Sequence, residues 1–268
     1  MAEGLDSNGH KGALVGGGAT NVTFYKNLFA HNAGRNPIFN TYDAKNITTI
    51  NAQVVNNLIY NWGYMGTEIQ LYDNKTVNAN IVGNYYKPGK DTDNYEITVG
   101  GIGSAKMYVK GNIGPRRSND SMNEWANVGY FDWNAWKNKG NSYGDPAPTS
   151  YRVTTPHDMP ALPTVSAFDA YNDVLENAGA TKPGRDAVDK RIINDVKNGT
   201  GRIIDHPSQV GGWPTLATGT PPADRDNDGM PDAWEIQQGL NPNNPNDRNG
   251  KLNGNGYTNL ERYLNSIA

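Results

Sequence analysis

The chain has 268 residues and a net charge of −3, and 36% of its residues are hydrophobic, enough for one long domain with a small appendage. Its 31 glycines and 16 prolines argue against a helical bundle, and the absence of cysteine excludes a disulfide framework. No apolar run is long enough for a membrane span, no signal-peptide pattern follows Met1, and no basic tail suggests a nucleic-acid partner.

A short motif, asparagine followed by apolar residues, recurs in the N-terminal part of the chain. It begins at Asn27, Asn57, Asn84 and Asn112, at intervals of 27–30 residues. Such a period, in β-branched and aromatic runs without helical periodicity, predicts stacked turns of strand. Asparagines at the same place in each turn can bond the backbone of a tight bend and one another. We expect an all-β protein, a right-handed parallel β-helix over residues 1–150 with a structural asparagine ladder.

Two helical patterns follow the repeats. Residues 166–176 begin with Ser166 as an N-cap and stop at Gly179, and residues 185–197 are amphipathic. We expect a C-terminal helical extension, residues 151–214, that packs on the β-helix and covers strand edges.

Residues 215–222 have the composition of a linker into a separate tail, residues 223–268. A twelve-residue loop at its start has carboxylates at positions 1, 3, 5, 9 and 12 and glycine at position 6, the pattern of a calcium loop. The alternative is a solvated acidic loop. The expected ligands are Asp224, Asp226, Asp228, Met230 through its carbonyl, Asp232 and Glu235. A decayed second copy offers weaker ligands, which are Asp247, Asn249, Asn253, Asn255 and Glu261. Any calcium ion bound there is expected to be structural.

Residues 3–16, 22–32 and 34–37 resemble the conserved region of bacterial pectate lyases of the parallel β-helix kind. Residues 185–193 and the tail, which is EF-hand-like or thrombospondin-like, resemble extensions of secreted members. The resemblance implies a secreted enzyme that cleaves polygalacturonate by β-elimination. In that reaction the proton on carbon 5 is removed and the oxygen on carbon 4 leaves.

The family's Arg-x-Pro motif matches Arg35, and the lysine before its glycine-rich turn matches Lys11. The resemblance implies Arg35 as the base and Lys11 as a stabiliser of the substrate carboxylate, alongside bound calcium. Because a guanidinium normally keeps its proton, two alternatives stay open. Arg35 binds the carboxylate while hydroxide or another group is the base, or it pairs with an aspartate and fixes a turn.

Several other cations follow the repeated asparagines at short offsets. Since stacked turns lie about 4.8 Å apart, such cations could line one edge of the coil and match an anionic polymer. Scattered surface charges are the alternative. The substrate-binding candidates are His10, Lys26, Asn36, Lys87, Lys90 and Arg116.

The chain also departs from the family. The family's catalytic calcium is held mainly by aspartates on turns that precede the segment opening this chain, and near Lys11 only Glu3 and Asp6 carry carboxylates. The open first turn would expose strand edges, which predicts a homo-oligomer. A non-catalytic carbohydrate-binding module and a structural spacer are alternative functions. A hydrolase is disfavoured because no pair of aspartates stands beside Arg35.

Overall fold

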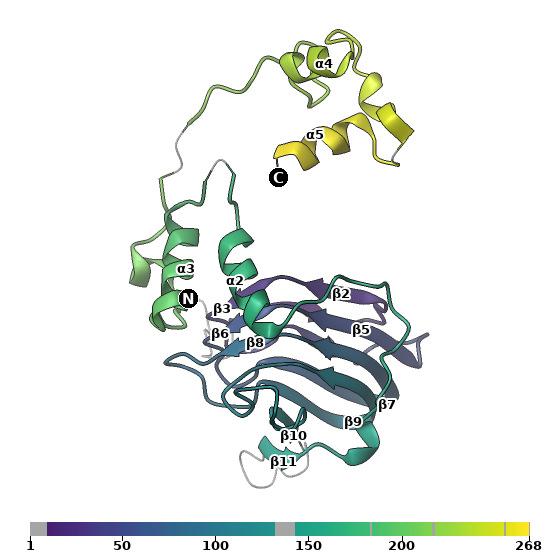
Figure 1. Ribbon diagram of the computed structural model, residues 1–268, viewed down its shortest axis with the longest axis vertical. Coiled ribbons are helices and arrows are strands. Elements are labelled where there is room, and N and C mark those ends of the chain that lie inside the picture. The colour runs from purple at the N-terminus through teal and green to yellow at the C-terminus, as the bar shows by residue number, and fades with distance from the viewer. Residues whose placement is uncertain (1–9, 132–142, 183, 216–217, 255, 268) are drawn as a thin grey trace. The chain divides into compact units, whose positions relative to one another are not determined.

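The computed structural model describes residues 10–131, 143–182, 184–215, 218–254 and 256–267. They form two compact units, one ending at Trp213 and the other running from Pro214 onward together with Ala180–Asp186. The first unit is a right-handed parallel β-helix (Figure 1). Its strands are β1 (Leu14–Val15), β2 (Val22–Tyr25), β3 (Leu28–Ala30), β4 (Ile38–Asn40), β5 (Thr49–Val55), β6 (Leu58–Tyr60), β7 (Thr67–Val82), β8 (Tyr85–Lys87), β9 (Ile97–Lys110), β10 (Val128–Phe131) and β11 (Tyr143–Pro146).

The strands stack because each turn pairs in parallel with the next. One sheet runs β1-β4-β7-β9-β10-β11, with β2 and β5 joined to it through β7, and a second sheet runs β3-β6-β8. Only the β10–β11 pair is antiparallel among the described strands. The register places apolar residues in columns inside the coil, as in Phe24↔Val54↔Ile81↔Val109. These columns form the core, where full burial of such a side chain contributes about 1.5–3 kcal/mol.

The asparagine ladder is confirmed. The amide Nδ2 of Asn27 donates to Asn57 Oδ1 (3.0 Å), that of Asn57 to Asn84 Oδ1 (2.9 Å) and that of Asn84 to Asn112 Oδ1 (2.8 Å). Each acceptor oxygen also takes the backbone N–H of the preceding ladder asparagine. The position before each ladder asparagine has a positive φ, between 53° and 63°, at Lys26, Asn56, Gly83 and Gly111. The ladder therefore satisfies polar groups at a bend that every turn repeats.

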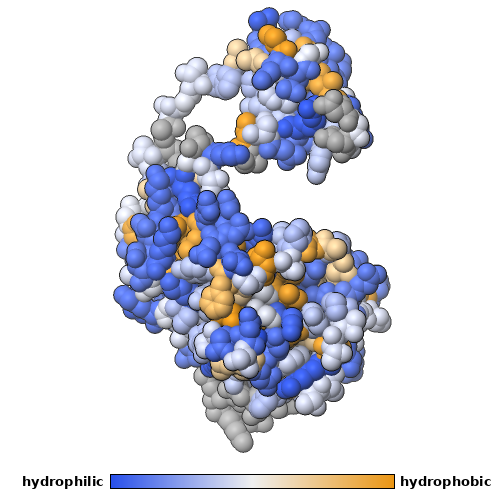
Figure 2. All heavy atoms as spheres, viewed as in Figure 1, coloured by the Kyte–Doolittle hydropathy of each residue, from blue (hydrophilic) through white to orange (hydrophobic). Residues whose placement is uncertain are grey.

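Two helices of the first unit, α2 (Ala167–Asn177) and α3 (Ala187–Asn198), cover the β3-β6-β8 sheet. The hydroxyl of Ser166 accepts the N–H of Asp169, so the predicted N-cap is confirmed. An apolar cluster joins the helices to the sheet through Val174, Leu175, Ile193, Val196, Leu58 and Tyr60. The visible face of the coil is otherwise mostly hydrophilic, with scattered apolar patches (Figure 2).

The second unit contains α4 (Asp232–Gln238) and α5 (Asn259–Ile267). Short 3₁₀ turns complete the two units, at Thr149–Tyr151, Pro207–Val210, Asp247–Asn249 and Leu252–Gly254. No helix in the described ranges combines the length and apolar character needed to cross a bilayer.

Replacement of Asn57 by alanine tests the ladder. Asn57 is fully buried, and its amide bonds Asn84 and the carbonyl of Phe24, so Asn57→Ala leaves buried partners unsatisfied. We expect a loss of about 2–4 kcal/mol in the free energy of unfolding, measured by urea denaturation. Asn27→Ala, at the exposed end of the ladder, should cost less than half as much. A loss below about 1 kcal/mol for Asn57→Ala would show that the ladder does not stabilise the coil.

Candidate functional site

Lys11 and Arg35 lie at one bend of the coil, on neighbouring turns. Lys11 forms a parallel bridge with Gly34, and its Nζ donates to the hydroxyl of Tyr64. Arg35 has a φ of 61°, a left-handed conformation that costs a non-glycine residue about 1 kcal/mol or more. Its side chain is half-buried, and its guanidinium makes no hydrogen bond or ion pair with the described part of the chain. The guanidinium of Arg35 is therefore available to bind an anion.

Glu68, at the start of β7, fixes the backbone of Arg35. Its Oε1 accepts the Arg35 N–H, and its side chain is 2% exposed. Burial raises the pKa of Glu68 from its ordinary 4.5 to about 7, although Arg35 and Lys11 oppose the rise. The absence of a side chain at Gly34 permits this packing, because a Cβ there would lie 3.0 Å from the Tyr64 ring. The acid that accompanies Arg35 thus bonds its backbone and leaves its guanidinium without a direct partner.

Two of the other predicted cations, Lys26 and Arg116, form ion pairs away from Arg35. Lys26 Nζ lies 2.7 Å from Asp173 Oδ2 on α2. Arg116 Nη1 lies 3.3 Å from Glu96 Oε2, and its guanidinium stacks 4.0 Å from the centroid of the Tyr95 ring. Lys90 is exposed.

The expectation that Lys87 lines an edge with Arg35 is wrong. Lys87 pairs with Tyr60 inside the β3-β6-β8 sheet, whereas Arg35 follows the next bend. Its Nζ donates to the carbonyl of Val196 (2.6 Å), near the C-terminal end of α3, where a cation is favoured.

Two further candidates for substrate binding have structural contacts. Asn36 is 1% exposed; its Nδ2 donates to the carbonyl of Met65 (3.2 Å) and its Oδ1 accepts from Asn32 (3.0 Å), so this side chain braces the bend. The Nε2 of His10 lies 3.6 Å from Asp205 Oδ1. The expected carboxylates Glu3 and Asp6 lie outside the described residues.

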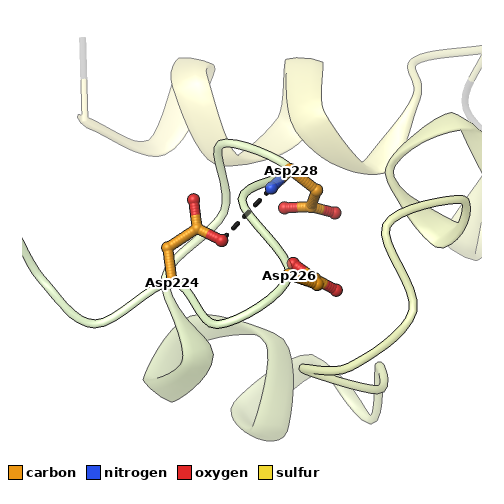
Figure 3. Close-up of side chains that lie close together, drawn as sticks. All are labelled: Asp224, Asp226 and Asp228. Carbon is orange, nitrogen blue, oxygen red and sulfur yellow. Dashed lines mark hydrogen bonds between the residues drawn. The ribbon is translucent and has the colours of Figure 1, made fainter.

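A second cluster, of carboxylates, lies in the tail. Figure 3 shows the side chains of Asp224, Asp226 and Asp228 gathered around one loop, where Asp224 Oδ1 accepts the N–H of Asp228 (3.2 Å). Several oxygens of this region are buried without a hydrogen-bond partner among the described residues. They belong to Asp226, Asp228, Glu235 and Asp247. Burial, together with neighbouring carboxylates, raises the pKa of Glu235 to about 7. Such converging, uncompensated oxygens fit a hard cation.

Asp247 was expected in a separate second loop, but it joins the first one. Ligand oxygens of Asp228, Glu235 and Asp247 lie within 4.8 Å of one another. Asp232 instead pairs with Arg225 (2.9 Å), and Glu261 accepts the N–H and hydroxyl of Thr258 at the start of α5.

The remaining expected ligands of the tail are less informative. Met230 is buried, with its N–H donated to Asp228 Oδ1 (2.8 Å), and Asn249 lies in the Asp247–Asn249 turn. Asn255 and the side chain of Asn253 lie outside the described residues.

Sequence reasoning missed Glu68 and Tyr64. The only local signal was a glutamate between the apolar or β-branched neighbours Thr67 and Ile69, which marks a strand position where a charge is unexpected.

The fold and these two clusters define a class, the parallel β-helix proteins with a cationic bend and an acidic, cation-fitting tail. No protein-family model matches the chain. The chain is 33% identical over 274 residues to the protein named probable pectate lyase C of Neosartorya fischeri, and 30% identical over 275 residues to its namesake in Aspergillus flavus. Each alignment covers the whole chain and 58% of the relative, so the chain spans somewhat more than half the length of these curated relatives. The chain is a relative of the proteins named probable pectate lyase C.

Glu68→Gln tests the electrostatics of the bend. Because the pKa of Glu68 is higher in the folded than in the unfolded protein, folding binds a proton between pH 4.5 and about 7, and stability falls as the pH rises through this window. Above pH 7 the buried charge of Glu68 lowers the free energy of unfolding by roughly 3 kcal/mol at most. Glutamine keeps an acceptor for the Arg35 N–H and carries no charge. Urea unfolding with saturating calcium should show Glu68→Gln gaining stability over the wild type from pH 5 to pH 8. Parallel pH profiles would contradict this assignment.

Proposed function

We propose that the protein is a polysaccharide lyase that cleaves polygalacturonate by β-elimination. The observation that carries the proposal is the half-buried guanidinium of Arg35, without an ion-pair partner among the described residues, beside Lys11 on a bend of the β-helix. Relatives named probable pectate lyase C support the reaction class. Cleavage of a plant polymer fits a secreted protein, and the β3 edge, which pairs only with β6 among the described strands, is compatible with a homo-oligomer.

The reaction needs positive charge where negative charge develops. Removal of the carbon-5 proton places charge on the neighbouring carboxylate, and the bond between carbon 4 and its oxygen then breaks to give a carbon–carbon double bond. The bond of the Arg35 backbone N–H to Glu68 fixes the backbone from which the guanidinium would reach the uronate. Lys11 carries a positive charge one turn away. In the proposed mechanism Arg35 acts as the base in its neutral guanidine form, which takes up the carbon-5 proton and becomes the cation beside the carboxylate. The alternative is that Arg35 stays charged throughout and only holds the carboxylate, while hydroxide or another group takes the proton.

A catalytic calcium ion is a family expectation that the described residues around Arg35 do not fit. The carboxylate groups close enough to share a metal, within the described ranges, all lie in the tail. No step of the proposed mechanism is therefore routed through a metal at the bend.

Arg35→Lys and Arg35→Ala test the catalytic role. Lysine keeps the charge and loses the planar fork, so both changes should lower kcat by about 100-fold or more. The measurement is the ultraviolet absorbance of the unsaturated product from polygalacturonate. Lys197→Ala, at an exposed lysine of α3, serves as the control and should stay within about twofold of the wild type. Arg35→Ala retaining more than a third of the wild-type rate would refute the role, and binding without any absorbance growth in the wild type would indicate a binding module.

We also propose that the tail binds calcium as a structural ion. Asp224, Asp226, Asp228, Glu235 and Asp247 would hold it, because their carboxylates converge and several of their oxygens are buried without partners among the described residues. The ion would neutralise charges that otherwise repel one another and would join the first loop to the turn that contains Asp247.

Asp247→Asn and Glu261→Gln separate this shared site from two independent loops. We expect Asp247→Asn to weaken calcium binding by roughly tenfold or more, and Glu261→Gln to leave it within about threefold, in calcium titrations by calorimetry. The reverse order of effects would place the ion in the second loop instead.

A further inference from the structure

Tyr64 crosses the cationic bend of the coil. It lies on the turn after Arg35, where its backbone N–H donates to the carbonyl of Ala33 (2.9 Å). Its ring passes over Gly34, since a Cβ at Gly34 would lie 3.0 Å from Tyr64 Cζ, the carbon that carries the hydroxyl. The hydroxyl reaches the Nζ of Lys11, whose backbone bridges Gly34 from the turn before. The phenol group of Tyr64 therefore lies against the residue that directly precedes Arg35.

The hydrogen bond between Lys11 and Tyr64 has only one possible direction. An ammonium has three donors and no acceptor, so the phenol oxygen accepts from Lys11 and its own proton points elsewhere. Within the described part of the chain, the Tyr64 hydroxyl donates to no other residue. Tyr64 is half-buried and borders a cavity of about 360 Å³. The phenol proton is therefore available to a ligand at the bend.

Elimination needs an acid as well as a base. When the bond at carbon 4 breaks, its oxygen leaves as an alkoxide unless a proton reaches it in the transition state. Glu68 is poorly placed to supply that proton, because it is 2% exposed and bonds the backbone of Arg35. Tyr72 is a poorer donor, because burial raises the pKa of its phenol. Tyr64 combines an available proton with an ammonium at its oxygen.

We infer that Tyr64 is the catalytic acid of the elimination and protonates the oxygen on carbon 4 as it leaves. This inference rests on the proposed function and adds the group that completes its chemistry. The electron pair of the carbon-5 C–H bond becomes the second bond between carbons 4 and 5, and its proton goes to the base. The electron pair of the carbon–oxygen bond goes to the leaving oxygen, which takes the phenol proton of Tyr64 and departs as a hydroxyl group.

Lys11 favours the proton transfer from Tyr64. The phenolate left after the transfer lies in contact with the Lys11 ammonium, and this attraction needs no rearrangement because the two groups are already bonded. With Arg35 as the base, the reaction converts a neutral guanidine and a phenol into a guanidinium and a phenolate. One proton carried by water from Arg35 to Tyr64 restores both groups for the next cycle.

Three carboxylates also border the cavity beside the phenol, those of Asp91, Asp93 and Asp205. They disfavour a phenolate, but none of them is hydrogen-bonded to Tyr64, whereas the Nζ of Lys11 is. Asp91 is moreover ion-paired with Arg202 (2.6 Å). Because charge interactions weaken with distance, the contact with Lys11 dominates at the phenol oxygen.

The experiment compares Tyr64→Phe with the wild type on polygalacturonate, by the absorbance of the unsaturated product. Phenylalanine keeps the ring over Gly34 and removes only the hydroxyl. We expect kcat to fall by about 100-fold or more, with KM within about threefold of the wild type. Tyr257→Phe, at a tyrosine of the tail that is 53% exposed, is the matched control and should leave kcat unchanged.

A second substrate separates an acid from a residue that only positions Lys11. It is a galacturonate trimer whose terminal carbon 4 carries a 4-nitrophenyl ether, because nitrophenolate leaves without a proton. We expect the loss of kcat in Tyr64→Phe to shrink to less than about fivefold on this substrate, while Arg35→Ala keeps its loss of about 100-fold. Each comparison is made within one variant, so a change in stability does not affect it.

Two results would overturn the acid role while leaving the proposed function intact. One is a Tyr64→Phe variant that keeps more than a third of the wild-type kcat on polygalacturonate. The other is an equal loss of kcat on the two substrates, which would make Tyr64 a positioning residue for Lys11. A wild type that forms no unsaturated product from polygalacturonate would refute the proposed function, and the acid role with it.

Discussion

Each turn of the coil must change direction without leaving a buried backbone group unpaired, and the asparagine ladder meets this requirement. Asn57, Asn84 and Asn112 are fully buried, and each side-chain oxygen accepts two N–H groups of the turn before. Because an unpaired buried polar group costs about 1–3 kcal/mol, the repeated bond fixes where every bend lies. The ladder also sets the position of Arg35, because the next bend comes eight residues after Asn27.

That next bend concentrates opposing charges in a small space. Glu68 is buried beside two cations, yet it bonds the backbone of Arg35 rather than its guanidinium. A direct ion pair with Glu68 would have neutralised the charge of the Arg35 guanidinium, which would then be less able to bind a substrate carboxylate. The arrangement instead uses the acid to hold a left-handed backbone and keeps the positive charge available, a division of roles that electrostatic catalysis favours.

Features that depend on a local sequence pattern could be predicted from the sequence. The ladder, the Ser166 cap and the acidic loop at Asp224 each depend on neighbours a few residues apart or on a fixed period. Features that depend on the register between turns could not. Glu68 reaches Arg35, and Asp247 reaches Glu235, through pairings that no local pattern encodes. Lys87 was misplaced for the same reason, because Lys87 and Arg35 follow their ladder asparagines at different offsets and a bend separates the two positions.

The central claim is that this cationic bend promotes elimination rather than hydrolysis, and the fate of water oxygen tests it most directly. Polygalacturonate would be digested by the protein in water enriched in heavy oxygen, and the products examined by mass spectrometry. Elimination predicts products with an unsaturated end and no heavy oxygen at the cleaved bond. Heavy oxygen incorporated at that bond, in products that lack the double bond, would contradict the account.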